Sequence, residues 1–139
     1  MNHSLKYEFL EHTSEIKFKA YGRTINEVFE NVVLAISDFM TKGKEIKPRK
    51  FKEIVVVGQD IESLLYNFLD EIIYLLDAEN FIVKKGEVFV RGNNVKATLY
   101  GDDASLYFGL ENVKAPTYSE MFVKKTDDGV WEFQAVLYF

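Results

Sequence analysis

The residues best suited to chemistry lie near the N-terminus, where two glutamates, a histidine and a threonine precede a strand-like alternation of apolar and polar residues. Such alternation predicts a strand with one buried face. On that strand Glu11, Thr13 and Glu15 would point to one side, and His12 and Ile16 to the other. Carboxylate and hydroxyl oxygens are the ligands that hard cations prefer, so this face is a candidate metal site.

The same segment resembles the opening signature of the archease family, which reads Glu/Asp-His-Thr-Ala-Asp-Ile/Val and is followed by an aromatic–glycine pair, here Tyr21-Gly22. The stretch from Val113 to Tyr118 is close to the family's Val/Ile-Lys-Ala-x-Thr-Tyr-His, and residues 60–75 are similar to its second helix. The matches run in order from Glu11 to Trp131, so the resemblance covers nearly the whole chain.

This resemblance implies a metal site that joins the two ends of the chain. Archeases have an Asp at the position of Glu15 and pair it with a final Asp-Ile, whose main chain also contributes. Here these positions hold Tyr138 and Phe139. A neutral phenol is a poor cation ligand, so the remaining ligands would be Glu15, the Tyr138 carbonyl and the Phe139 oxygens, including a terminal carboxylate. We therefore expect Ca²⁺ or Mg²⁺ to bind more weakly than in the family, or not at all.

Two further residues are candidates for positioning a partner or a nucleotide. His12 is either a hydrogen-bonded core residue or a residue that orients the loop carrying Glu15. Lys114 is either a solvent-facing lysine or a cation beside Glu15 that contacts an anionic partner or phosphate. Pro116 removes a main-chain donor, which predicts an edge strand or a bulge. Ser119 replaces the family's histidine, whose role is either lost here or taken by a hydroxyl.

The function that the resemblance implies is accessory and not catalytic. Archeases activate the GTP-dependent RNA ligase that joins tRNA halves by promoting its guanylylation and its multiple turnover, with RNA contacted only indirectly. The sequence agrees, because it has two histidines, no cysteine and no glycine-rich phosphate loop. Two alternatives stay open: a metal-binding or chaperone-like interaction module acting on several RNA-processing proteins, and a hydrolase that needs a bound divalent cation.

Length and composition bound these possibilities. The 139 residues, 47% of them hydrophobic, predict one domain over residues 1–139. The absence of cysteine excludes disulfides and thiolate zinc sites and fits a reducing cytoplasm. No apolar run approaches the ~20 residues of a membrane span, and the N-terminal residues lack the apolar block of a signal peptide. The net charge of −5 argues against broad, nonspecific nucleic-acid binding.

The periodicity predicts an α+β fold, with two helices packed on a largely antiparallel or mixed β-sheet. A capping box at Thr24 predicts a helix that Gly43 ends, and Asp60 caps a second helix that ends at Asn80. The predicted strands are Glu11–Tyr21, Phe51–Val57, Phe81–Lys84, Glu87–Arg91, Val95–Tyr100, Tyr118–Lys125 and Val130–Tyr138.

Two groups of charges remain. A basic run is made of Lys42, Lys44, Lys47, Arg49, Lys50 and Lys52. It is either a solvated loop or a contact for phosphate or a partner, and Phe51 is its one interleaved aromatic, so base stacking is not indicated for the run. Asp102 and Asp103 are predicted at a turn, where aspartate forms local hydrogen bonds, and we assign them nothing else.

Overall fold

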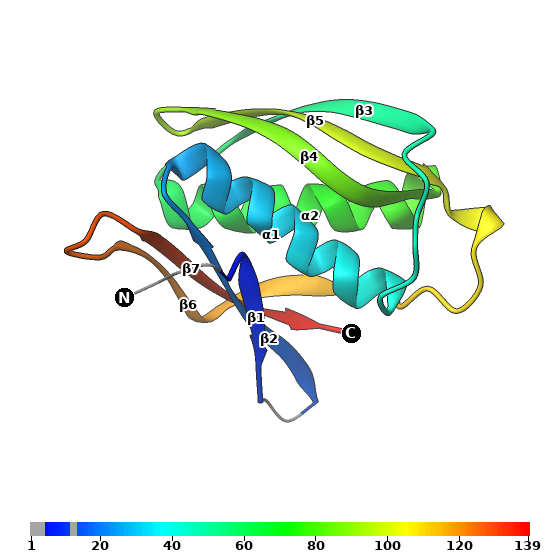
Figure 1. Ribbon diagram of the computed structural model, residues 1–139, viewed down its shortest axis with the longest axis horizontal. Coiled ribbons are helices and arrows are strands. Elements are labelled where there is room, and N and C mark those ends of the chain that lie inside the picture. The colour runs from blue at the N-terminus through cyan, green and yellow to red at the C-terminus, as the bar shows by residue number, and fades with distance from the viewer. Residues whose placement is uncertain (1–4, 12–13) are drawn as a thin grey trace.

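Two helices form the middle layer of the structure, a computed structural model that describes residues 5–11 and 14–139 (Figure 1). Helix α1 (Ile25–Thr41) begins after Thr24, whose hydroxyl accepts a hydrogen bond from the Glu27 N–H at 3.1 Å. Helix α2 (Ile61–Glu79) follows Asp60, which accepts from the Ser63 N–H, and ends at Asn80 in the left-handed conformation. Both helices begin at the predicted caps, because side-chain oxygens there satisfy main-chain N–H groups that the helix leaves open.

The strands lie in two antiparallel sheets on opposite sides of the helices (Figure 1). One sheet has the order β1-β2-β7-β6 and the other the order β3-β5-β4. The α+β fold class and the two helices are confirmed, but the strands divide into two sheets where one was predicted. The strands are β1 (Tyr7–Leu10), β2 (Glu15–Gly22), β3 (Lys50–Val57), β4 (Phe81–Arg91), β5 (Asn94–Asp103), β6 (Ala115–Lys125) and β7 (Trp131–Tyr138).

One hydrophobic core fills the spaces between the three layers. At its centre Phe29 of α1 is fully buried and meets Phe68 of α2 and Phe133 of β7 edge to face, with ring centroids 5.3 and 5.1 Å apart. The core explains the wide apolar stripes of both helices, because each helix is covered by a sheet on two sides.

The N-terminal segment differs from the prediction. The strand expected to include Glu11 begins only at Glu15, and the unpredicted β1 pairs with it as a hairpin. Ser14 has a φ of 63°, a left-handed conformation that breaks an extended strand. The prediction that Glu11 and Glu15 share one strand face is therefore wrong. His12 and Thr13 lie outside the described residues.

The edge strand β6 carries a long bulge, as Pro116 led us to predict. Its register against β7 shifts between Thr117 and Phe122, and Glu120 within the bulge has a φ of 59°. Strand β4 is one continuous strand where two were predicted, Phe81–Lys84 and Glu87–Arg91. Its register has an irregularity between Val83 and Lys85. No helix in residues 5–11 and 14–139 is long and apolar enough to span a membrane.

Candidate functional site

Glu15 and the C-terminal residues lie together at one end of the four-stranded sheet. Glu15 is the first residue of β2 and is paired across the sheet with Tyr138, the last residue of β7. Residues directly opposite each other in antiparallel strands have their side chains on the same face. The half-buried Glu15 and the partly exposed Tyr138 therefore share one corner of the outer face, although 123 positions separate them in the chain.

Lys114 completes this corner through its main chain. Its N–H donates a hydrogen bond to the Tyr138 carbonyl at 2.7 Å, just before β6 begins. The Phe139 ring packs against Phe39 of α1 with ring centroids 5.4 Å apart, which holds the end of β7 against the helix. We call Glu15, Lys114, Tyr138 and Phe139 the acidic corner.

The bulge of β6 lies beside the acidic corner. Lys17, two residues after Glu15 and on the same face of β2, forms an ion pair of 2.9 Å with Glu120 of the bulge. Gln134 donates to the Glu120 carbonyl at 2.7 Å, and the Ser119 N–H donates to the Thr117 hydroxyl at 3.1 Å. These contacts hold the bulge over β7, so Ser119 lies in an ordered segment next to the corner.

The acidic corner fits a resident metal ion poorly. Ca²⁺ takes six to eight oxygen ligands, usually several of them carboxylates. Among the residues that the structure describes, no three Asp, Glu, His or Cys side chains come together as a metal site. The Tyr138 carbonyl already accepts the Lys114 N–H. The corner thus provides one carboxylate beside main-chain oxygens, and not a closed set of cation ligands.

The basic run is largely paired within the protein. Lys42 contacts Glu111 at 3.7 Å, Lys52 contacts Glu79 at 2.7 Å, and Lys44 donates to the Phe108 carbonyl. These contacts support the solvated-loop interpretation for this part of the run. They leave Lys50 at the edge of a small hollow beneath β3.

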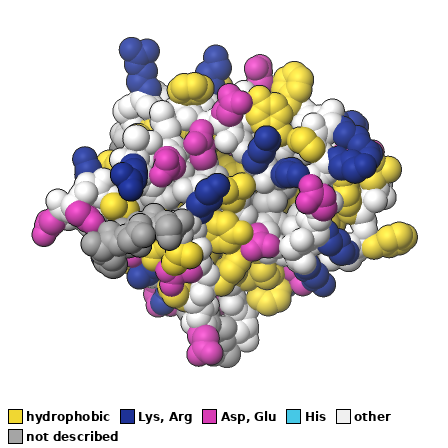
Figure 2. All heavy atoms as spheres, in the orientation of Figure 1, with side chains coloured by type: hydrophobic (Ala, Val, Ile, Leu, Met, Phe, Trp, Pro, Cys, Tyr) yellow, Lys and Arg dark blue, Asp and Glu magenta, His cyan; other side chains and the backbone are white. Residues whose placement is uncertain are grey.

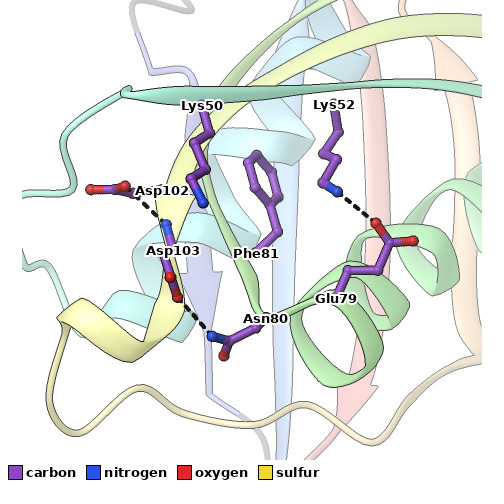
Figure 3. A pocket seen from close by; sticks show the side chains of 7 residues that line it. All are labelled: Lys50, Lys52, Glu79, Asn80, Phe81, Asp102 and Asp103. Atoms are coloured by element: carbon purple, nitrogen blue, oxygen red, sulfur yellow. Dashed lines mark hydrogen bonds and ion pairs between the residues drawn. The ribbon is translucent and has the colours of Figure 1, made fainter.

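Figure 3 shows this hollow, which has a volume of about 100 Å³. It is lined by Lys50, Lys52, Glu79, Asn80, Phe81, Asp102 and Asp103. Its acidic side chains are already engaged: Glu79 pairs with Lys52, and Asp103 accepts from Asn80 at 2.7 Å. The hollow therefore lies between the end of α2 and strands β3 and β5, and its lysine and acidic side chains compensate one another in charge.

Asp102 is the group there that sequence reasoning missed. Its side chain is 2% exposed, accepts from the Tyr107 hydroxyl at 2.7 Å and lies 3.6 Å from Arg49. The Tyr107 hydroxyl in turn accepts from the Lys47 N–H at 3.0 Å. Asp102 therefore ties two loops to β5, and the assignment of this residue to an ordinary turn is wrong. An aspartate pair before a loop carries no sequence signal that separates burial from local hydrogen bonding.

Asp102 should make the stability of the fold sensitive to acid. The Tyr107 hydrogen bond, the Asp103 N–H and the nearby Arg49 outweigh burial and lower the pKa of Asp102 below its ordinary 3.8. A lowered folded-state pKa contributes stability that is present above the unfolded pKa and is lost as the pH falls through the folded value. Asp102→Asn should thus be destabilised at pH 7, and the difference in unfolding free energy from wild type should shrink below pH 3.8.

Urea unfolding at pH 7 and at about pH 3, followed by circular dichroism, measures this difference. Tyr107→Phe is the matched control, because it removes the hydrogen bond that contributes most to the lowered pKa of Asp102 and keeps the carboxylate. In Tyr107→Phe, the loss of unfolding free energy between pH 7 and about pH 3 that Asp102 causes should be smaller than in the wild type, but still present. A difference that stays constant between the two pH values would show that the charge of Asp102 contributes nothing.

Comparison with known proteins places this architecture. Residues 7–137 match the Archease protein family (MTH1598/TM1083). The chain is 36% identical to the protein archease of Pyrococcus abyssi, over 94% of this chain and 96% of the relative. It is 38% identical to that of Methanosarcina barkeri, over 95% and 94%.

Two solved structures share the fold. The solution structure of Methanobacterium thermoautotrophicum protein 1598 has a TM-score of 0.78 and 26% identity, covering 96% of this chain and 99% of the other. The crystal structure of an archease from Thermotoga maritima, described as a possible chaperone, has a TM-score of 0.60 at 18% identity, covering 99% and 100%, and is similar in fold. With the family match over nearly all residues, these relatives lead to one conclusion: the chain belongs to the archease protein family.

Proposed function

We propose that this chain is an accessory protein that activates the GTP-dependent tRNA-splicing RNA ligase by promoting its guanylylation and multiple turnover. The observation that carries the proposal is the pairing of Glu15 with Tyr138, with the Lys114 main chain bonded to the same residue. Membership of the archease family supports it further. In this proposal the chain has no catalytic residue of its own.

The acidic corner acts by docking at the metal and nucleotide pocket of the ligase. The main chain of Glu15 pairs with Tyr138 of β7, so the sheet fixes the point from which the Glu15 side chain leaves before the partner arrives. A preplaced carboxylate lowers a barrier by positioning, since little freedom is lost on docking. Glu15 helps to place the ligase's cation, and the exposed Lys114 contacts the triphosphate. No resident metal of this chain is needed.

Glu15→Gln tests the proposal in a guanylylation and multiple-turnover ligation assay with the cognate ligase. The substitution keeps the size of the side chain and removes its charge. We expect the stimulation by this protein to fall at least about tenfold, since losing one partner of a desolvated charge contact costs about 2–5 kcal/mol. Lys114→Gln should weaken stimulation in the same direction.

Asp127→Asn is the matched control, because it also converts a carboxylate to an amide. Asp127 is exposed in the β6–β7 turn, beyond the strand ends opposite the acidic corner. The variant should stimulate like the wild type. Unchanged urea unfolding midpoints would show that all three variants are folded. If Glu15→Gln stimulated the ligase as strongly as the wild type does, this carboxylate would have no part in the mechanism. If the wild-type protein itself failed to stimulate the ligase, the ligase proposal would be overturned.

A second candidate function is a chaperone-like interaction module that acts on several RNA-processing proteins. The description of the Thermotoga maritima relative as a possible chaperone favours it. The two candidates differ in the number of partners. Affinity capture with the intact chain should recover one dominant ligase under the first proposal and several unrelated RNA-processing proteins under the second.

A further inference from the structure

We propose that the outer face of the three-stranded sheet binds single-stranded nucleic acid, which the proposed function makes an RNA. The chain then contacts RNA directly, where the family resemblance led us to expect indirect contact. This face of β3, β5 and β4 is turned away from the helices and lies on the opposite side of the molecule from the four-stranded sheet (Figure 1). Figure 2 shows hydrophobic, basic and acidic side chains projecting along this upper edge of the molecule.

Three aromatic rings stand on the face. Phe51 and Phe89 are 62% and 65% exposed, an unusual state for phenylalanine in a folded chain. Phe51 pairs directly with Tyr100, so two rings from adjacent strands lie side by side. Phe89 lies opposite Lys96, four positions along β5 from Tyr100 and so roughly 13 Å away. The rings therefore make two separate platforms on which bases can stack.

The cations of this face are available, unlike most of those on the other sheet. On the four-stranded sheet Lys17 pairs with Glu120, and both Lys19 and Lys124 pair with Glu132. Across residues 5–11 and 14–139, by contrast, no acidic side chain forms an ion pair with Lys85, Lys96 or Arg91. Lys85 instead lies 5.9 Å from the Tyr100 ring centre. Unpaired cations beside exposed rings are the combination that holds phosphates while bases stack.

The charges in the middle of the face favour nucleic acid over an apolar partner or a second copy. Lys96 stands between Val55 and Phe89, and Glu53 and Glu87 flank Thr98 in the next row. A close apolar interface would bury these charges at its centre, where charged residues are normally depleted. A single strand laid with its bases inward leaves the ammonium groups at phosphates. It offers base amino groups to Glu53 and to Glu87, which also accepts from the Tyr100 hydroxyl at 3.3 Å.

The test is direct binding, measured by the fluorescence anisotropy of a labelled single-stranded RNA of about 12 nucleotides. A DNA strand of the same sequence and an RNA duplex form the other arms. The Phe51→Ala/Phe89→Ala double variant should bind the RNA at least about tenfold more weakly, since each stacked base contributes about 5- to 150-fold in affinity and two stacking rings are lost. Lys96→Gln should weaken binding and reduce its dependence on salt.

Phe108→Ala is the matched control. Phe108 is 92% exposed but lies in the loop after β5, off this face, so its removal should leave RNA affinity unchanged. RNA binding at least as tight as DNA binding, with weak duplex binding, supports the proposal. Tighter binding of DNA or of the duplex would overturn it, as would an unaffected double variant or no binding by the wild type.

Light scattering adds one more decisive outcome. A wild-type dimer that the double variant converts to a monomer would assign the face to a second copy and overturn the proposal. The binding assay contains no ligase, so its failure would leave the Glu15 stimulation assay standing. Failure of that stimulation assay would in turn leave RNA binding by this face untouched.

Discussion

Phe29→Ala should lower the free energy of unfolding by about 3–5 kcal/mol, the usual cost of emptying a phenylalanine site in a core. Phe29 is fully buried and is the one ring that touches an aromatic residue of α2 and one of β7 at the same time, among the described residues. Its truncation removes apolar contacts from both partner rings and leaves a cavity between α2 and β7.

Urea unfolding followed by circular dichroism measures the loss. Phe51→Ala is the matched control, since the same side chain is removed from a site that is 62% exposed. It should change the free energy of unfolding by no more than about 0.5 kcal/mol. If the two variants lost the same free energy of unfolding, the buried aromatic contacts of Phe29 would contribute nothing to the stability of the fold.

Gly101→Ala is the second substitution with a large expected effect. A Cβ at this position would lie 2.0 Å from the Ile82 carbonyl oxygen and 2.9 Å from the Phe81 ring. The contact is with the main chain of β4 beside its irregularity, so no side-chain rotation relieves it. We expect a loss of about 3 kcal/mol or more in unfolding free energy, at or above the upper end for overpacked positions.

Gly86→Ala gives the comparison within the same sheet. Its Cβ would lie 2.8 Å from the Leu99 Cδ2 atom, the end of a side chain that can move. The cost should stay within about 1.5 kcal/mol. If Gly86→Ala proved as costly as Gly101→Ala, close approach of the β4 backbone would not be the reason for a glycine at position 101.

Local signals predicted the elements well where one residue type decides the structure. Thr24 and Asp60 cap helices because their oxygens accept main-chain N–H groups, and both helices begin after them. Gly92-Asn93 links β4 to β5 because glycine adopts the positive φ that a two-residue turn needs. Pro116 lies on an edge strand because it cannot donate to a neighbour.

The division into two sheets could not be predicted from such signals. Pairing between β2 and β7 joins Glu15 to Tyr138, and no local pattern reports a partner so far away in the chain. The wide apolar stripes of α1 and α2 predicted that most of each helix is buried. They did not indicate that the strands covering the helices belong to two sheets. Strand β1 was missed because its alternation covers only Tyr7–Leu10.

The candidate site was predicted in part. Resemblance to the family brought Glu15, Lys114, Tyr138 and Phe139 into one hypothesis, and the structure places these four residues at one corner. Their roles stay predictions. The rings of the three-stranded sheet escaped notice because Phe51, Phe89 and Tyr100 belong to three strands, and only the register puts them on one face.

The pairing of β2 with β7 also has a consequence for synthesis on the ribosome. Strand β2 emerges early, yet its neighbour β7 is translated more than 100 residues later. Until then the edge of β2 that pairs with β7 is open and can recruit foreign strands. The β3–β4–β5 segment with α2 needs only residues 50–103 and can assemble earlier. We therefore infer that nascent chains are most prone to aggregate just before Tyr138 leaves the exit tunnel.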